Sequence, residues 1–305
     1  MARAIQFTEY GDPDVLQLVD VLTPEPGEGQ VRVAVRAVGV NAYDWKVRSG
    51  AYSDGTPLAG PTRTGLDFAG VVDALGSGVE GLEVGQAVLG KAPGAAATHV
   101  AADAAGLVPR PDSLSFELAA ALPTPTETAV RSLRLLDPKP GTLLIHAAAG
   151  GVGLVAAQLA RSRGLTVIGT ASDPNHAFLR EIGVVPVTYG DGLVERVRAV
   201  APQGVDAVLD ASGRGVLPDS IELAGGPERV VTIADFQGAE YGVRVTGGGA
   251  DSVPMREAFA EVLPLLERGE LKVPIEHVFP LDRAAEAHRV SQTGHLRGRI
   301  VLTVD

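Results

Sequence analysis

The pattern of hydrophobic and polar positions changes character near residue 115. Before that point, short segments alternate apolar and polar residues, as in 31–38, where Val and Ala alternate with Arg and Ala. Such alternation is typical of a strand that buries one face. Glycines divide the segment 68–89 into short strands; they are Gly76, Gly78, Gly81 and Gly85. We therefore expect residues 1–115 to form a compact, barrel-like β domain, with no helix-length periodic segment.

From about residue 116, apolar runs of four or five residues alternate with amphipathic stretches of ten or more. This βαβ rhythm predicts a doubly wound parallel sheet, which binds ligands at the carboxyl ends of its strands. The predicted strands are 142–146, 166–169, 185–187, 205–209 and 229–233, and the first helix between them is 151–163. The tail adds a helix pattern at 282–293 and a last strand at 299–304.

The stretch HAAAGGVGLVAAQLA, residues 146–160, places three glycines in four positions between a predicted strand and a predicted helix. Bare backbone at a helix N-terminus favours a phosphate, because several N–H groups and the helix dipole then meet the anion. Close backbone approach at Gly150 and Gly151 suits a pyrophosphate, and Gly153 suits tight packing of helix on strand. The alternative is a turn that merely tolerates glycine. The candidate cofactor residues of this loop are Ala149, Gly150, Gly151, Val152 and Gly153.

The end of the second predicted strand bears on the choice of cofactor. An acid at its tip would hold a ribose 2′-hydroxyl, but the chain continues as Thr170-Ala171-Ser172. With Ser172, His176 and Arg180 as donors, NADPH is favoured over NADH. We interpret Asp173 as a helix N-cap before Pro174. If it is not a cap, it weakens the preference for NADPH.

Composition narrows the class of protein. The chain has 305 residues, 45% of them hydrophobic, and a formal net charge of -11, which disfavours nucleic acid as a partner. No apolar run approaches the ~20 residues of a membrane span, so we expect a cytoplasmic protein without a membrane partner. With no cysteine, thiolate metal sites and disulfides are excluded.

Several short motifs resemble those of the medium-chain dehydrogenases/reductases, specifically the zinc-free, zeta-crystallin-like quinone oxidoreductase branch. The segment 39–52 is similar to the family's G-x-N-x-x-D-x-x-x-R-x-G-x-Y stretch. The other matching segments, in family order, are 65–72, 76–79, 122–129, 206–213 and 298–302. The resemblance implies an α/β protein with a GroES-like β-rich catalytic domain at 1–115, a Rossmann cofactor domain at 116–272 and a return segment at 273–305.

The resemblance also implies a site without zinc. Asn41 and Leu66 stand where zinc-dependent relatives have a ligand Cys and a ligand His, and neither can supply thiolate or imidazole. Asn41 and Tyr52 are expected to face the substrate, and Thr128 to lie near the nicotinamide. Tyr52 would donate a hydrogen bond or proton to a nascent oxyanion; water, or a Tyr that only shapes the pocket, is the alternative. Gly213 would admit the cofactor closely.

The expected function is reduction of a quinone or an α,β-unsaturated carbonyl by NADPH, because both acceptors delocalise the developing charge onto oxygen. One alternative is an enoyl-thioester reductase, although no basic cluster suited to its phosphopantetheine or CoA arm is evident. Another is a sensor or structural protein that binds NADPH without turnover. A His replaces the family's usual phosphate-binding Lys at His176, so the NADPH preference is expected to be modest. Family members pair through sheet edges, and the region 243–245 predicts a homodimer.

Overall fold

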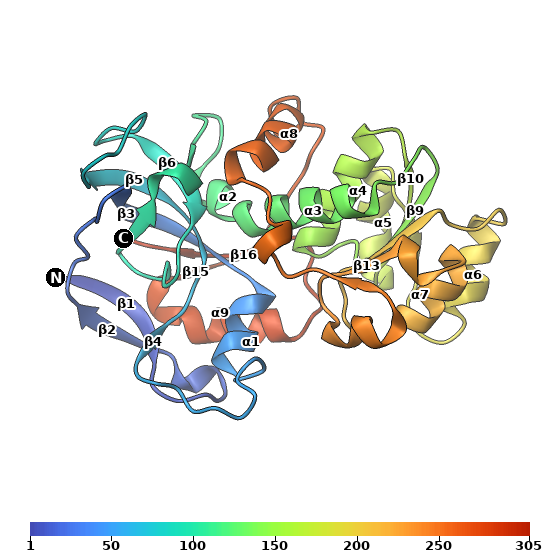
Figure 1. Ribbon diagram of the computed structural model, residues 1–305, viewed down its shortest axis with the longest axis horizontal. Coiled ribbons are helices and arrows are strands. Elements are labelled where there is room, and N and C mark those ends of the chain that lie inside the picture. Colours follow the sequence, from blue (N-terminus) through green and yellow to red (C-terminus); the bar gives the residue numbers. More distant parts are fainter. The chain divides into compact units, whose positions relative to one another are not determined.

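The computed structural model describes residues 1–305, which form two compact units (Figure 1). Unit one combines Met1–Thr124 with Pro274–Asp305, and unit two comprises Pro125–Val273. Unit one continues beyond residue 115, because helix α2 (Phe116–Ala120) packs against strands β3 and β5 of that unit. The first change of unit therefore falls within the next helix, α3 (Pro123–Leu136).

The main sheet of unit one is built from both ends of the chain. Its strand order is β15-β16-β3-β5-β6-β8, with β7 also pairing with β3. Strand β3 runs antiparallel to β16, β5 and β7, whereas β15 is parallel to β16. The bounds are β3 Gln30–Val40, β5 Asp67–Leu75, β6 Ala87–Lys91, β7 His99–Asp103, β8 Val108–Pro109, β15 Ile275–Pro280 and β16 Arg299–Thr303.

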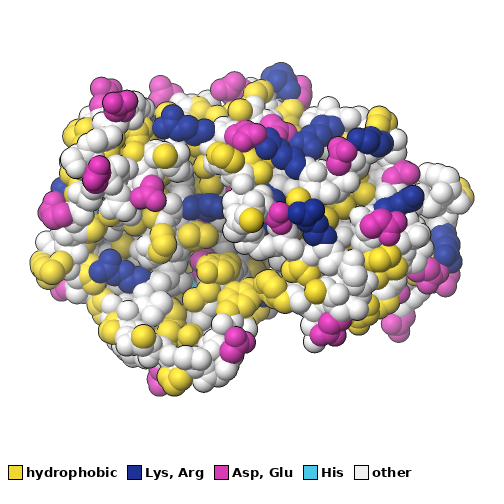
Figure 2. All heavy atoms as spheres, in the orientation of Figure 1, with side chains coloured by type: hydrophobic (Ala, Val, Ile, Leu, Met, Phe, Trp, Pro, Cys, Tyr) yellow, Lys and Arg dark blue, Asp and Glu magenta, His cyan; other side chains and the backbone are white.

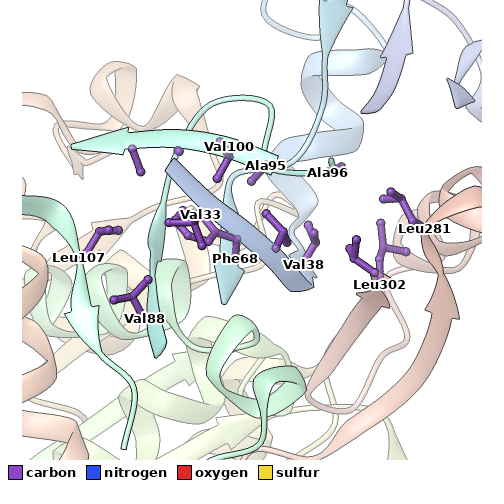
Figure 3. Packing of buried hydrophobic residues seen from close by; sticks show 14 of the residues in the cluster. Val33, Val38, Phe68, Val88, Ala95, Ala96, Val100, Leu107, Leu281 and Leu302 are labelled. Atoms are coloured by element: carbon purple, nitrogen blue, oxygen red, sulfur yellow. The ribbon is translucent and has the colours of Figure 1, made fainter. Parts of the chain in front are cut away.

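Apolar side chains of this sheet form the core of unit one. Along the first half of β3 buried residues alternate with partly exposed ones, as the sequence pattern predicts. Figure 3 shows Leu281 and Leu302, from the end of the chain, beside Val38 of β3. The C-terminal segment thus completes a core that the N-terminal residues begin.

Smaller elements complete unit one. A second sheet has the order β2-β1-β4, with bounds β1 Ala2–Phe7, β2 Gln17–Val21 and β4 Thr62–Arg63. Helix α9 (Ala284–Gln292) contacts helix α1 and strands β15 and β16. It lies within the helix pattern predicted at 282–293, whose first residues form a short 3-10 turn.

Helix α1 (Ala42–Arg48) is an element that the hydrophobic pattern of unit one did not predict. Seven residues are too few to show a helical period clearly. The local signal is instead a capping box, with Asn41 at the N-cap and Asp44 three residues later. The N–H of Asn41 donates to Asp44 Oδ2 at 2.7 Å. A short polar motif, rather than an apolar stripe, therefore starts this helix.

Unit two contains a parallel sheet with the order β11-β10-β9-β12-β13-β14. The first strand of this sheet, β9, lies between β10 and β12. The strands are therefore added on one side of β9 as far as β11 and then on its other side from β12. This order confirms the predicted doubly wound α/β architecture. The bounds are β9 Thr142–His146, β10 Thr166–Thr170, β11 Val185–Val187, β12 Ala207–Asp210, β13 Val230–Thr232 and β14 Arg244–Val245.

Helices connect and cover these strands. Helix α4 contacts β9 and β10, α5 and α6 contact β11, and α7 contacts β12 and β13. The bounds are α4 Gly151–Ser162, α5 His176–Glu181, α6 Leu193–Val200, α7 Leu217–Ala224 and α8 Met255–Glu267. The five predicted strands each overlap an observed one, because a buried parallel strand needs a nearly continuous apolar run.

The surface carries both signs of charge. Figure 2 shows acidic and basic side chains interspersed over the face in view. None of the helices combines the length and the apolar character needed to cross a membrane.

Candidate functional site

A tight turn joins strand β9 to helix α4 in unit two. Ala147 has a φ of +56°, a left-handed conformation that is uncommon for a residue with a side chain. Its N–H donates to Thr170 Oγ1 (3.1 Å), and the N–H of Ala148 donates to the Thr170 carbonyl oxygen (3.0 Å). Helix α4 then begins at Gly151, with Gly150 as its N-cap. The neighbouring strand β10 therefore holds the turn in place.

The glycines of this turn differ in their surroundings. A Cβ on Gly153 would lie 2.3 Å from the Ala147 carbonyl oxygen and 2.9 Å from the Ala148 Cα. A Cβ on Gly150 would meet only the Ala147 carbonyl oxygen, at 3.3 Å. Gly153 is therefore needed for close packing of the helix on the turn. Gly150 instead leaves open space beside the start of the helix.

The first turn of α4 offers backbone donors to an anion. The N–H of Leu154 donates to the Gly150 carbonyl oxygen at 2.8 Å. The N–H groups of Gly151, Val152 and Gly153 come before this first intrahelical bond and so lack a partner within the helix. Ala149, which precedes the N-cap Gly150, is buried. The helix dipole adds partial positive charge at the same place, so these residues can hold a phosphate group.

Ser172, rather than Asp173, occupies the N-cap position after strand β10. It precedes the 3-10 helix η3 (Asp173–Asn175), and its Oγ accepts from Asn175 Nδ2 at 3.2 Å. Asp173 lies in the first turn of η3, where its Oδ1 accepts from Thr188 Oγ1 at 2.7 Å. The interpretation of Asp173 as an N-cap is therefore wrong. Its carboxylate, 79% exposed, remains at the carboxyl edge of the sheet.

The other candidate residues at this strand end lie on both sides of Asp173. Thr170, the last residue of β10, is buried against the turn described above. His176 begins α5, and its Nε2 lies 3.2 Å from the Ala171 carbonyl oxygen, so this nitrogen donates its proton there. Arg180 is exposed near the end of the same helix. A neutral His176 would therefore have no second N–H to give a phosphate.

A carboxylate organises the loop after strand β12. Asp210 Oδ1 accepts from the N–H groups of Ser212 (2.8 Å) and Gly213 (3.1 Å), and Oδ2 accepts from Thr232 Oγ1 (2.8 Å). Gly213 has a φ of +62°, and a Cβ there would lie 2.6 Å from the Ala234 carbonyl oxygen. Glycine is therefore required by the backbone at this point of the loop. The sequence analysis expected Gly213 to admit the cofactor closely, but it did not identify Asp210 as the residue that shapes the loop.

His146, at the end of β9, is buried and hydrogen-bonded. Its Nε2 lies 3.0 Å from Ser220 Oγ, and its Nδ1 lies 3.4 Å from Thr170 Oγ1. Burial lowers the pKa of the imidazole, although the nearby Asp210 opposes the effect. The ring therefore stays neutral near pH 7, as expected for a packed residue rather than a catalytic one.

Thr128 lies on α3 beside a buried ion pair that the sequence analysis missed. Arg131 Nε lies 2.9 Å from Glu127 Oε1, and both side chains are almost fully buried. Arg131 also donates to Thr246 Oγ1 (2.5 Å), and the N–H of Val253 donates to Glu127 Oε1 (3.2 Å). The pair thus joins α3 to the segment that follows β14. The signal available in the sequence was the i, i+4 spacing of Glu and Arg on one helix.

In unit one, Asn41 belongs to a buried polar cluster. Its side chain is 4% exposed, and its Oδ1 accepts from Arg299 Nη2 at 2.9 Å. The same Arg299 nitrogen lies 3.5 Å from Asp67 Oδ2. Asp67 also accepts from the N–H (3.0 Å) and the Oγ1 (2.5 Å) of Thr124. Arg299 and Asp67 lie 232 residues apart in sequence, so no local pattern could reveal the cluster.

Two carboxyl groups in this cluster are strongly perturbed. Burial raises the pKa of Asp44 to about 7, and the hydrogen bond from the Asn41 N–H only partly opposes it. Burial likewise raises the pKa of Asp67, although Arg299 stabilises its charged form. The Arg299 guanidinium therefore stabilises the charged forms of two buried carboxyl groups, those of Asp44 and Asp67. The net charge of the cluster is smaller when Asp44 keeps its proton.

Tyr52 is exposed on the loop after α1 and stacks on Tyr43. The two ring centroids are 5.8 Å apart with an interplanar angle of 28°. Partial burial, together with Tyr43, raises the pKa of the Tyr52 phenol. Tyr52 is 40% exposed, and its raised pKa keeps the phenol protonated at neutral pH.

The candidate residues thus fall into two groups. In unit two the turn 149–153 follows β9, the segment 170–176 starts at the end of β10, and Gly213 follows β12. All three therefore lie at the carboxyl ends of neighbouring strands. Asn41 and Tyr52 belong to unit one. The structure contains no group of three or more His, Asp or Glu side chains placed to hold a metal ion.

Comparison with known families matches both parts of the chain. The alcohol dehydrogenase GroES-like domain matches residues 27–112, and the zinc-binding dehydrogenase domain matches residues 183–302. A quinone oxidoreductase of Pseudomonas aeruginosa is 36% identical, with 99% of each chain covered. The chain is also 38% identical, over 93% of its length, to pikromycin polyketide synthase component PikAII of Streptomyces venezuelae, but it spans only 8% of that protein.

Solved structures show the same fold. The quinone oxidoreductase of Escherichia coli complexed with NADPH is 28% identical, with a TM-score of 0.87 and full coverage of both chains. The CurK enoyl reductase is 26% identical, also with a TM-score of 0.87, and the match covers 100% of this chain and 99% of that one.

Proposed function

Since the chain belongs to the quinone oxidoreductase branch of the medium-chain dehydrogenases/reductases, we propose that it is an NADPH-dependent, zinc-independent reductase of quinones or α,β-unsaturated carbonyls. Zinc independence is supported by the residues at the expected ligand positions. Asn41 accepts a hydrogen bond from Arg299, Leu66 has no ligating atom, and the chain has no cysteine.

The observation that carries the proposal is the turn between β9 and α4. Three unpaired N–H groups at a helix N-terminus, with Gly153 packed on Ala147, form a cradle that fits a pyrophosphate. In doubly wound folds the two halves of a dinucleotide bind at the carboxyl ends of the strands on either side of such a turn. NADPH bound there would supply the hydride.

Tyr52 is the proposed donor to the acceptor oxygen. Its raised phenol pKa keeps the proton on Oη at neutral pH, so Oη can donate a hydrogen bond as negative charge develops on the substrate oxygen. Transfer of the proton itself would follow only when the substrate oxygen becomes the stronger base. Asn41 has a different character, because the bond from Arg299 fixes its amide inside the cluster. We propose that Asn41 sets the shape and polarity of the site rather than moving a proton.

A second candidate function is reduction of an enoyl thioester. The similarity to a polyketide synthase component and to an enoyl reductase favours it. A thioester enone delocalises charge onto its carbonyl oxygen in the same way, so the same donor would serve. A third possibility, a protein that binds NADPH without turnover, predicts tight binding and no oxidation.

One experiment separates these functions. NADPH and NADH fluorescence are titrated separately, and each bound cofactor is then offered 1,4-naphthoquinone, a simple enone and crotonyl-CoA. Oxidation by the quinone or the enone supports the main proposal, and oxidation by crotonyl-CoA alone supports the second candidate. Binding without oxidation by any acceptor contradicts both. Tyr52→Phe, which keeps the ring stacking on Tyr43, should lower kcat by about 10- to 100-fold with little change in NADPH affinity.

A further inference from the structure

We propose that Tyr43 is a specificity-determining residue, whose aromatic ring makes the site favour flat, ring-shaped acceptors over open-chain ones. The inference rests on the proposed function and deepens it, because it concerns which acceptor the same site takes. Tyr43 falls on a position that the motif G-x-N-x-x-D-x-x-x-R-x-G-x-Y leaves open, so the family resemblance assigns it no role.

Tyr43 is held in the first turn of helix α1. It is the second residue of the helix, and the capping box between Asn41 and Asp44 fixes the turn around it. The neighbouring Asp44 is buried, whereas Tyr43 is 51% exposed. The helix therefore buries its acidic residue and presents the Tyr43 ring at the surface of unit one.

Tyr52 reaches the same ring through the turn that follows the helix. Gly50 has a φ of +79°, which lets the chain reverse its direction after α1. The N–H of Ala51 then donates to the Lys46 carbonyl oxygen at 3.0 Å. This bond ties the turn back to the helix, and the Tyr52 ring lies against that of Tyr43.

The two rings form one partly exposed aromatic surface. Their centroid distance of 5.8 Å and interplanar angle of 28° lie in the range that aromatic pairs favour. Half of Tyr43 and 40% of Tyr52 stay exposed in this arrangement, so both rings keep area for a third partner. A flat conjugated acceptor can stack on this surface with its whole ring, whereas an open-chain acceptor covers little of it.

The two tyrosines therefore have separable effects. Tyr52 Oη is the proposed donor to the acceptor oxygen, which every acceptor has, so loss of that donor lowers kcat for all of them. The Tyr43 ring contacts only the part of an acceptor that is itself a ring, so its loss raises KM for ring acceptors alone. Specificity is the difference between the two acceptors, and Tyr43 acts on that difference.

The test is the kcat/KM for 1,4-naphthoquinone divided by the kcat/KM for 3-penten-2-one, measured with the full chain and saturating NADPH. Tyr43→Leu removes the ring, and Tyr43→Phe keeps it. The matched control is His277→Leu, which removes an exposed ring from another ring pair of unit one. The rings of His277 and Phe279 have a centroid distance of 6.0 Å and an interplanar angle of 31°.

We expect Tyr43→Leu to lower the ratio by about three- to tenfold through a higher KM for naphthoquinone. Tyr43→Phe and His277→Leu should keep the wild-type ratio. If the wild type reduces only the quinone, the KM for that acceptor decides in the same way, and an unchanged KM in Tyr43→Leu contradicts the inference.

Other outcomes separate this inference from the proposed function. If Tyr43→Leu keeps the ratio, or lowers kcat for both acceptors alike, Tyr43 only supports Tyr52; the inference is then wrong and the proposed function stands. The same holds if the wild type reduces the enone but not the quinone. If the wild type oxidises NADPH with neither acceptor, the proposed function fails and this inference with it.

Discussion

Burial of the Asp44 carboxyl group makes the stability of unit one depend on pH. In the folded chain Asp44 keeps its proton up to a pKa of about 7, whereas the unfolded chain releases it near the ordinary value of 3.8. Between these values the folded state binds more protons, so stability falls as pH rises. From pH 5 to pH 8 this one group should remove about 3 kcal/mol from the free energy of unfolding.

Asp44→Asn tests this dependence, because Asn keeps an acceptor for the Asn41 N–H but has no proton to lose. Urea unfolding at several pH values should give a curve for the variant that falls less steeply than that of the wild type. Asp54→Asn is the control, since Asp54 is exposed in the same unit. Equal slopes for Asp44→Asn and wild type would contradict the assigned burial effect.

Individual site residues could be predicted from the sequence only where the motif itself carries the chemistry. The turn 149–153 is of this kind, because glycine spacing, strand and helix all lie within one local segment. Asn41 is not, because its partner Arg299 enters from the last strand of the chain. Pairings across such a separation depend on tertiary packing, which one sequence does not encode in any local pattern.

At the scale of an element, the start of α4 should respond differently to a methyl group at two neighbouring glycines. Gly153→Ala places a Cβ 2.3 Å from the Ala147 carbonyl oxygen, so helix and turn must separate. We expect a loss of about 1 to 3 kcal/mol in stability together with weaker cofactor binding. Gly150→Ala meets only one atom, at 3.3 Å, so it should retain stability and lose affinity alone. Thermal unfolding and NADPH titration of both variants separate the two effects.

The buried pair Glu127–Arg131 should contribute more to the stability of unit two than the exposed ion pairs between Arg134 of the same helix and helix α8. Arg131→Met leaves the Glu127 carboxylate buried without its partner, and we expect a loss of about 3 to 5 kcal/mol in the free energy of unfolding. The double variant Glu127→Leu/Arg131→Met should recover most of this loss, because it removes both charges.

The control for that prediction is Arg134→Met, three residues farther along α3. Arg134 forms ion pairs with Glu257 and Glu261 at 2.7 Å each, but its side chain is 39% exposed. Solvent screening limits such pairs to about 1 kcal/mol or less. Denaturant unfolding of the three variants gives the comparison, and equal losses for Arg131→Met and Arg134→Met would refute the role of burial.

Elements were predictable in proportion to the length and uniformity of their apolar pattern. Strands β9 and β11 match their predicted bounds, since each is a short apolar run at a well-marked position. Helix α1 was not predicted, because it is short and its N-terminus is marked by a capping box rather than by an apolar pattern. The 3-10 helix η3 shifted the N-cap from Asp173 to Ser172, because one residue of turn chemistry decides such a boundary.

At the scale of the whole molecule, the order of strands and helices along the chain made the fold class of unit two predictable. The same order did not reveal how the C-terminal segment returns to unit one. Alternating strands and helices in unit two imply a parallel sheet directly. The return of Pro274–Asp305 to unit one, by contrast, was expected only from the family resemblance. A last helix and strand carry no local sign of the sheet that they join.

The edge strand β14 leads to a prediction about assembly. It is the last strand of the sheet in unit two and pairs only with β13. The N–H of Thr246 donates to the Thr232 carbonyl oxygen on β13, so the backbone N–H of the preceding Val245 points toward the open edge. Two copies could pair there, and we expect a homodimer whose mass is twice 31.4 kDa.

Val245→Pro removes this donor and should shift the protein toward the monomer in light scattering at micromolar concentration. Val278→Ser, which changes an exposed residue on the edge strand β15 of unit one, should leave the dimer intact. A monomeric wild type, or a Val245→Pro protein that folds and remains fully dimeric, would show that β14 is not the interface.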